Sequence, residues 1–309
     1  MGRYVARRLL QMIPVVLGTT FVIYTMVWAL PANPFQGKCG TRPCPERYVA
    51  AMTEKYNLND NLLVQYGKYL GSLVQGDFGT TFSGVPVLDE LVRTYPVTVR
   101  LAFLAIVIQV VIGMAAGVLA ALRRGGFADS LVLVSTLAVI SIPVFVIGHL
   151  MQLTLGINWG IFPVTARGAD PSWYSLVMPA MVLASTSLAY VARLMRATLV
   201  ENLRADYVRT ATAKGLPRAR VVGVHTVRNS LIPVITFLGV DFGALLGGAI
   251  VTEGIFGIGG VGGLIFRSIN LQEGAVVTGA VTVLVLIFLL VNLLVDLLYA
   301  ALDPRIRYG

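Results

Sequence analysis

The stretch LAFLAIVIQVVIGMAAGVLAAL, residues 101–122, carries no charged side chain and is followed directly by Arg123 and Arg124. A helix needs about 20 mainly apolar residues to cross the hydrocarbon core of a bilayer. This stretch therefore predicts a transmembrane helix. The composition of the whole chain agrees, since 56% of its residues are hydrophobic, 13% are charged and its mean hydropathy is +0.79. Such a chain cannot hide its apolar surface in one soluble core, so it belongs in a membrane.

Six apolar runs of this length occur in the chain, and they predict an all-α integral membrane protein with six transmembrane helices. The runs cover roughly residues 9–30, 97–122, 130–156, 174–197, 229–252 and 275–301. The third run contains Pro143, which neighbouring helices would have to accommodate, and His149. Six crossings place both ends of the chain on one side of the membrane.

The basic residues predict which side that is, because Lys and Arg concentrate in cytoplasmic segments. One side collects most of them: Arg3, Arg7, Arg8, Arg123, Arg124, Arg193, Arg196, Arg204, Arg209, Lys214, Arg218, Arg220, Arg228, Arg305 and Arg307. The short segments on the other side hold only Arg167 and Arg267. We therefore expect both termini in the cytoplasm. The net charge of +9 follows this topology, and we expect no nucleic-acid partner because stacking aromatics do not alternate with the basic residues.

The N-terminal run has two interpretations, since Arg3, Arg7 and Arg8 before an apolar segment also describe a signal peptide. The run to Leu30 is long for a signal core, and the residues after it form a poor cleavage site, which favours a retained anchor. The expected organisation is a first transmembrane helix (1–30), an extracytoplasmic loop region (31–96), a core with five transmembrane helices (97–302) and a cytoplasmic tail (303–309).

The 31–96 region is the longest segment that is predicted to lie outside the membrane. The apolar spacing over Met52 to Tyr69 predicts an amphipathic helix that is broken at Asn57 to Asn61. Cys39 and Cys44 are the only cysteines of the chain and both lie in this region. An oxidising compartment favours a disulfide between them, with two free thiols as the alternative. A metal site is disfavoured, because zinc needs four ligands and no other Cys or His lies nearby.

The polar stretch Glu201 to Asn229, ENLRADYVRTATAKGLPRARVVGVHTVRN, separates two apolar runs. Its first half predicts a short helix of small residues that ends at Gly215, before Pro217. A second short basic helix is expected from Pro217 towards Arg228. The segment is too polar to enter lipid and is tied at both ends to spans. The loop 198–228 is therefore suited to docking on a cytoplasmic partner.

Enzyme chemistry is nearly absent from the sequence. No G-x-x-x-x-G-K-[ST] phosphate loop occurs, so the chain is not expected to hydrolyse ATP. With only His149 and His225, which fall in a span and in the cytoplasmic loop, a Ser-His-Asp site is hard to build. The run GIFGIGGVGG, Gly254 to Gly263, follows a membrane span rather than a βαβ strand, so it predicts a tight turn or re-entrant element and not a dinucleotide site.

Two acidic residues in or beside the fifth apolar run are candidates for lining a pathway through the membrane. Asp241 lies near the middle of the fifth run, where an ionisable side chain marks either a functional site or a hydrogen bond to a neighbouring helix. Both interpretations stay open. Glu253 lies at the outer end of the same run, where an interfacial or loop-anchoring charge is the simpler interpretation.

Five segments give the chain a resemblance to a known family: RYVARRLLQMIPVVLG (3–18), YGKYLGSLVQGDFGTTFSGVPV (66–87), DYVRTATAKGLPRARVVGVHTVRNSLIPV (206–234), LLGGAIVTEGIFGIGG (245–260) and LDPRIRYG (302–309). Together they resemble the DppB/OppB type of inner-membrane permease from peptide-importing ATP-binding-cassette (ABC) transporters. The resemblance implies a type I importer permease fold in a bacterial plasma membrane. It implies four kinds of partner: a second homologous permease, one or two cytoplasmic ATPase subunits, an extracytoplasmic binding protein and a peptide substrate.

The resemblance also implies a role for the polar loop. In this family the loop corresponds to the EAA loop, whose short helix sits in a cleft of the ATPase subunit. Arg209, Thr210 and Ala211 then occupy the E-A-A positions, Gly215 is the loop glycine, and Asp206 and Lys214 flank the helix. The resemblance implies no cofactor in this chain, because ATP and Mg²⁺ bind to the partner ATPases.

Some positions depart from the family pattern. Arg209 replaces the glutamate of the E-A-A motif, Asp241 stands where glutamine is commoner, and Pro31 to Pro34 replace Pro-Gly-Asp-Pro. Ile258 to Gly260 stand in place of Trp-Pro-Gly. The nearest alternative is a related importer of nickel, glutathione or another small solute. Two alternatives from other classes are disfavoured. A membrane-embedded enzyme would need paired catalytic groups at one membrane depth, and the sequence offers no such pair. A scaffold that transports nothing would need no charged residue such as Asp241 inside a span.

Overall fold

The structure is a computed structural model that describes residues 2–29, 39, 44–246 and 249–302. The described residues form helices, turns and loops, and the one β-type contact among them is an isolated bridge between Thr80 and Pro86. The predicted tail 303–309 and the Pro31 to Pro34 segment lie outside the described residues. The all-α prediction agrees with the described part of the chain.

Five helices are long and apolar enough to cross a membrane: Val5–Trp28, Val87–Leu122, Trp173–Asn202, Arg218–Leu246 and Gly274–Leu297. The first belongs to α1 (Gly2–Trp28), the third is α9 and the last belongs to α15 (Gly274–Leu302). The second combines α5 (Val87–Ile108), η1 (Gln109–Gly113) and α6 (Met114–Leu122). The fourth combines α11 (Arg218–Arg220), η3 (Val221–Val227) and α12 (Arg228–Leu246).

Two further helix pairs are apolar enough but sharply bent. The first pair is α7 (Phe127–Ser141) and α8 (Val144–Met151) with η2 (Gln152–Asn158), and it bends by 103° at Pro143. The second pair is α13 (Ile250–Phe256) and α14 (Val261–Asn270), which bends by 80°. The described chain therefore holds five to seven candidate crossings. The predicted span over 130–156 thus corresponds to a bent helix pair, because Pro143 starts a new helix.

Two predicted span limits also differ from the structure. The second helix begins at Val87 and not near residue 97, because Val87, Leu91 and Thr94 are buried and packing extends the helix past Pro96. The fifth span ends at Leu246 and not near residue 252, and a new helix, α13, begins at Ile250. The sixth predicted run, 275–301, matches α15.

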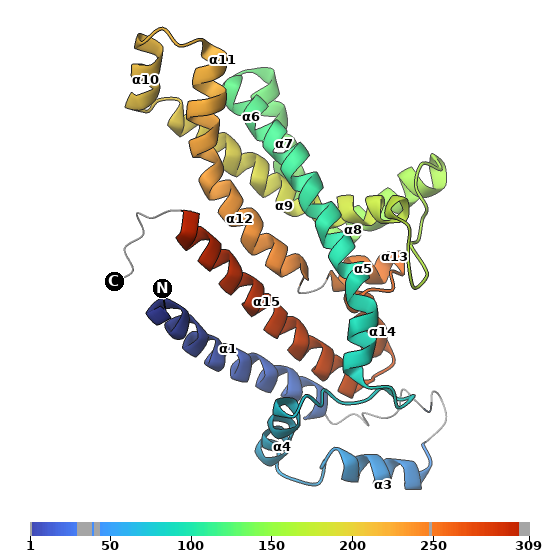
Figure 1. The fold of residues 1–309 in the computed structure, drawn as a ribbon. Helices are drawn as coiled ribbons and strands as arrows, with labels where there is room; N and C mark the ends of the chain where they lie inside the picture. The colour runs from blue at the N-terminus through green and yellow to red at the C-terminus, as the bar shows by residue number, and fades with distance from the viewer. Residues whose placement is uncertain (1, 30–38, 40–43, 247–248, 303–309) are drawn as a thin grey trace.

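The long helices pack in a bundle in which α1 lies along α15, and α9 contacts α5, α6, α7 and α12 (Figure 1). Small residues allow close approach, as is common between membrane helices. A Cβ on Gly117 of α6 would lie 2.5 Å from the backbone oxygen of Ala192 on α9. A Cβ on Gly239 of α12 would lie 2.8 Å from the side chain of Val295 on α15. Close packing thus depends on glycine at these helix contacts.

The two ends of the bundle carry different elements. One end, which we call the α10 end, holds α10 (Asp206–Ala213) and α11; the other, the α4 end, holds α3 (Glu46–Lys55) and α4 (Leu62–Val74) (Figure 1). Towards the start of α1 and the end of α15, Arg8 pairs with Asp296 at 3.0 Å. The predicted break at Asn57 to Asn61 is confirmed, because α3 ends at Lys55 and α4 begins at Leu62.

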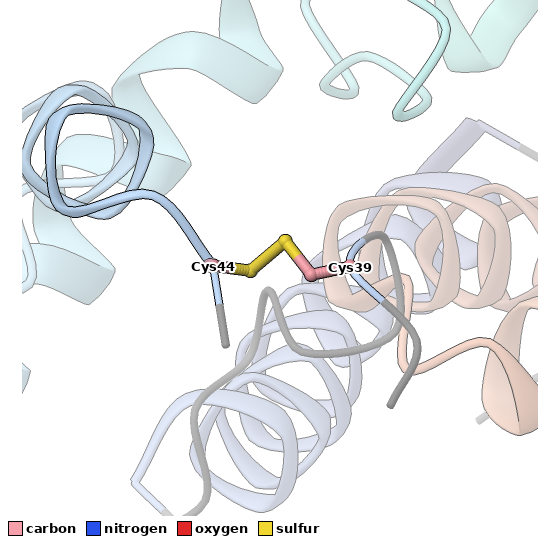
Figure 2. Close-up of a disulfide and its surroundings, with 2 residues drawn as sticks. All are labelled: Cys39 and Cys44. Carbon is pink, nitrogen blue, oxygen red and sulfur yellow. A yellow bond between two sulfur atoms is a disulfide. The ribbon is translucent and has the colours of Figure 1, made fainter. Parts of the chain in front are cut away.

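The 31–96 region is fixed to the bundle by aromatic rings. Trp28 of α1 stacks on Tyr56 with ring centroids 4.9 Å apart, and Tyr24 lies 5.1 Å from Tyr69 of α4. Cys39 and Cys44 form a disulfide with their Cα atoms 5.4 Å apart, and Figure 2 shows it beside the helices. The two helices of this region are thus held on the bundle by ring contacts.

Candidate functional site

The polar stretch after α9 folds into a helical element that projects from the bundle at its α10 end (Figure 1). The helix α9 ends at Asn202, a short turn follows, and α10 runs from Asp206 to Ala213. After a second turn, α11 begins at Arg218 and continues without interruption through η3 into α12. The basic helix expected from Pro217 towards Arg228 is therefore present, but it is not short. Its residues are the first turns of the fourth long helix, Arg218–Leu246, which extends beyond its apolar section.

Gly215 closes α10 with a left-handed cap. Its φ is +76°, its N–H donates to Thr212 O at 3.0 Å, and Leu216 N–H donates to Ala211 O at 3.3 Å. These two hydrogen bonds are those of the Schellman motif, which satisfies the last carbonyls of a helix. Leu216 packs on the cluster that contains Ala211, the apolar contact that accompanies this motif. The cap therefore fixes the angle between α10 and α11.

The inner face of α10 is bound to the two long helices that flank it. Val208 and Ala211 are buried against Val221 of η3. Tyr207 Oη donates to Asn202 Oδ1 at 2.7 Å, and Asn202 Nδ2 donates to Ser230 Oγ on α12 at 3.1 Å. These contacts connect α10 to both α9 and α12.

The outer face of α10 is exposed and polar. Among the six predicted loop residues, Asp206, Arg209, Thr210, Lys214 and Gly215 are exposed, whereas Ala211 is buried in the inner face. Arg209 and Asp206 form an ion pair at 3.6 Å with side chains that are 76% and 97% exposed. An ion pair this exposed adds little stability, so these charges are available to a partner.

Asp241 lies where three helices meet. Gln109 of η1 donates from Nε2 to Asp241 Oδ2 at 2.9 Å, and Ser187 of α9 donates from Oγ to Asp241 Oδ1 at 2.8 Å. Asp241 is half-buried, and Gln109 is fully buried. The hydrogen-bonded interpretation of Asp241 thus has a geometric basis. Both donors are neutral, so the hydrogen bonds leave the charge without a counter-charge.

Glu253 lies in α13 and faces the bend between α13 and α14. Its carboxylate accepts from Thr98 Oγ1 on α5 and from Gly263 N, each at 2.9 Å. Thr98 Oγ1 also accepts from Val261 N at 2.9 Å. Glu253 is completely buried, so it is not the interfacial charge that its position suggests; it anchors the glycine-rich loop to α5. A direct place in the translocation pathway stays a prediction.

Sequence reasoning missed an ion pair near the α10 end. Arg196 of α9 donates to the Asp129 carboxylate at 2.5 and 2.8 Å, and Gly125 N donates to Asp129 at 2.9 Å. In the sequence Arg196 only contributes to the charge count. Gln109 also went unnoticed, although it is the one strongly polar residue within residues 101–122. An isolated polar residue in such a run was the signal that could have found it.

Comparison with known protein families accounts for most of the chain. The family described as "Binding-protein-dependent transport system inner membrane component" matches residues 113–308. Its N-terminal counterpart, "Binding-prot-dependent transport system membrane comp, N-term", matches residues 1–102. The chain belongs to this family. It is therefore a membrane permease component of a transport system, a kind of subunit that is not itself an enzyme.

Similar proteins cover the chain from end to end. The dipeptide transport system permease protein DppB of Alkalihalophilus pseudofirmus is 34% identical over 99% of both chains. The Bacillus subtilis protein of the same name is 37% identical over 99% of this chain and 98% of its own. The glutathione transport system permease protein GsiC of Escherichia coli K12 is 36% identical over the full length of both. The resemblance to DppB-type permeases is thus confirmed.

Proposed function

We propose that this permease forms one half of the translocation pathway of an ABC importer for di- and oligopeptides. A second homologous permease forms the other half, one or two cytoplasmic ATPase subunits bind and hydrolyse ATP with Mg²⁺, and an extracytoplasmic binding protein delivers the substrate. The observation that carries this proposal is the exposed α10, which is capped at Gly215 and bound to two long helices. Its six predicted residues, Asp206, Arg209, Thr210, Ala211, Lys214 and Gly215, form the ATPase-coupling loop.

The coupling follows from the contacts of α10. Because Val208 and Ala211 pack on η3, and η3 continues into α12, a movement of α10 also moves the helix that carries Asp241. Closure of the two ATPase subunits on ATP would favour one arrangement of the paired permeases over the other. The loop thus transmits the free energy of nucleotide binding to the pathway.

Peptide is the substrate best supported by the similar proteins, two of which are named dipeptide permeases. Glutathione is the second candidate, because a relative that is named a glutathione permease matches the full chain at 36% identity. Glutathione is itself a small peptide, so the two candidates differ less in chemistry than in name.

Six crossings with both termini in the cytoplasm are supported by the contacts of the bent helices. The Arg196–Asp129 pair joins the start of α7 to the part of α9 that leads to α10. The helix α9 is about 45 Å long at 1.5 Å per residue, so its first residue, Trp173, lies at the opposite end of the bundle from its last turn. These contacts support a membrane crossing by the chain between α7 and α9, despite its bend at Pro143.

The second bent pair is better explained as a re-entrant element. A Cβ on Gly274, at the start of α15, would lie 2.6 Å from Val27 near the end of α1, and Gly279 lies against Phe78 of the 31–96 region. The helix α15 thus begins at the α4 end, whereas α12 ends part-way along α15, since a Cβ on Gly243 would lie 3.3 Å from Val291. The short helices α13 and α14 connect these two levels without adding a crossing. In this topology residues 1–30 are an anchor, 31–96 are outside, 198–228 and 303–309 are cytoplasmic, and the membrane is a bacterial plasma membrane.

Uptake by the reconstituted importer tests the proposed function. Proteoliposomes with both permeases, the ATPases and the binding protein should accumulate labelled dipeptides when ATP is supplied inside. This chain alone should show no ATPase activity above background. Uptake of neither peptides nor glutathione would disprove the substrate proposal, and reporter fusions that place residues 198–228 outside would disprove the topology.

A further inference from the structure

Asp241 has an unbalanced charge deep in the bundle. It lies about 20 Å along α12 from Arg228 at 1.5 Å per residue, well inside a hydrocarbon core about 30 Å thick. None of the ion pairs among the described residues includes Asp241. A carboxylate at this depth faces a bundle interior or a watery cavity and needs a partner. Its two hydrogen-bond donors are neutral and do not supply one.

The group beside Asp241 also lacks a donor. Gln109 is fully buried, and while its Nε2 donates to Asp241, its Oε1 has no hydrogen-bond partner in the described part of the chain. A buried acceptor without a donor is costly, so it indicates a missing group. The cluster thus offers a carboxylate and an amide oxygen as acceptors. An ammonium group has three donors and one positive charge, so it can balance the carboxylate and donate a hydrogen bond to the amide oxygen.

The cluster is accessible from one side. Asp241 is half-buried, and Ala244, one turn further along the same face of α12, is exposed, so this face is not fully covered by the described part of the chain. One turn closer to the α10 end on the same helices, Tyr190 and Phe237 form a ring pair with centroids 6.3 Å apart. Aromatic faces attract cations, so these rings extend the surface that favours a cationic group.

We propose that Asp241, Gln109 and Ser187 form a site for the free amino group of the substrate as it passes through the pathway. This inference rests on the proposed function and deepens it, because both candidate substrates carry a primary amine. The carboxylate supplies the counter-charge, and Gln109 and Ser187 hold it in position through their hydrogen bonds. Asp241 and the Gln109 amide oxygen are then the acceptors for the ammonium.

Selectivity for the amine tests the site separately from transport itself. The purified complex of both permeases and the ATPases, without the binding protein, is heated with alanyl-alanine or with N-acetyl-alanyl-alanine. We expect alanyl-alanine alone to raise the melting temperature of the wild type, and neither compound to raise that of Asp241→Asn. Asp296→Asn is the matched control, since that carboxylate is paired with Arg8, and it should keep the wild-type selectivity. Equal effects of the two compounds on the wild type would overturn the inference.

Uptake then separates the remaining outcomes. With the binding protein present, Asp241→Asn should import alanyl-alanine about tenfold more slowly or worse, the loss expected for one hydrogen bond to a charged group. Unchanged uptake would overturn the amine site and leave the proposed function intact. Failure of Asp241→Asn to co-purify with the second permease would also overturn it, since a basic side chain of that subunit would then be the partner. If the wild type imports no peptide and no glutathione, the proposed function itself fails.

Discussion

Two parts of this permease share a pattern of helix, glycine and helix, yet the structure uses them in opposite ways. In the polar loop 198–228, the proposed coupling loop, Gly215 has a φ of +76° and no atom lies within 4 Å of a Cβ placed on it. In the α13–α14 bend Gly257 has a φ of +63°, and the glycines that follow are surrounded by other atoms. A Cβ on Gly263 would collide with the backbone oxygen of Ile258. Gly215 thus forms an exposed turn, whereas the glycines after Gly257 allow other atoms to pack closely against a buried turn.

The acidic residues near the two turns differ in the same way. Asp206, close to the first, is exposed and forms only a long ion pair, so it is free to meet a partner. Glu253, close to the second, is buried and accepts two hydrogen bonds from its own chain. The comparison teaches that a left-handed glycine marks where a helix stops. The side chains around that glycine decide whether the turn stays exposed for a partner protein or is buried against other helices of the same chain.

The largest expected effect comes from filling the buried bend. Gly263→Val places a branched side chain against the Ile258 carbonyl, which is backbone and cannot rotate away. We expect a loss of more than about 3 kcal/mol, the upper range for overpacking, and little monodisperse protein on size-exclusion chromatography. Gly223→Ala is the control, because Gly223 has open space around it. If Gly263→Val purifies and melts like the wild type, the bend is not the packed element described above.

Removal of the buried acceptor should have the next largest effect. Glu253→Leu leaves the Thr98 hydroxyl and the Gly263 N–H without their acceptor, which costs about 2–3 kcal/mol. The apparent melting temperature of the detergent-purified protein measures this loss. Glu253→Gln keeps one acceptor oxygen and should lose less. Equal melting temperatures for Glu253→Leu and the wild type would contradict the anchoring role of Glu253.

Strain at the exposed turn should have a smaller effect on stability and a larger one on coupling. Gly215→Val forces a branched residue into the left-handed region, at about 1–2 kcal/mol, and Gly215→Asn is the control because asparagine tolerates that region. Gly215→Asp adds a negative charge to the docking surface as well. We expect Gly215→Val and Gly215→Asp to reach the membrane but to bind the ATPase weakly or to uncouple hydrolysis from uptake. Normal substrate-stimulated transport by both variants would show that this loop is not the coupling element.

The smallest effect on stability is expected on the outer face of α10. Arg209→Ala removes one side of an exposed ion pair, so the melting temperature should not change measurably. If the outer face docks on the ATPase, the same variant should still weaken co-purification of that subunit. Thr212→Ala is the control, because Thr212 lies on the same helix and its hydroxyl bonds back to Val208 O. A large drop in melting temperature with Arg209→Ala would show that the outer face is structural.

Much of this protein follows from local sequence. The apolar runs identify the long helices because a bilayer imposes a minimum length, and Gly215 before Pro217 marks the end of α10 because few other residues adopt its conformation. The break between α3 and α4 follows from Asn57 to Asn61 in the same way. The family could be recognised from five short segments, two of which, 206–234 and 245–260, contain the left-handed glycines Gly215 and Gly257.

Only the tertiary structure decided how the polar residues are paired. Gln109 and Ser187 are far from Asp241 in the sequence, and Thr98 is far from Glu253, so no local pattern predicts their hydrogen bonds. The early start of α5 was missed for a related reason, because burial of Val87, Leu91 and Thr94 extends the helix past Pro96. The bend at Pro143 follows instead from the proline itself, which starts a new helix. The sequence by itself determined which segments are long and apolar enough to cross a membrane and that α10 stops at Gly215. The contacts between helices determined which polar groups are satisfied internally and which, like Asp241, still need a partner, because burial depends on neighbours that no single segment contains.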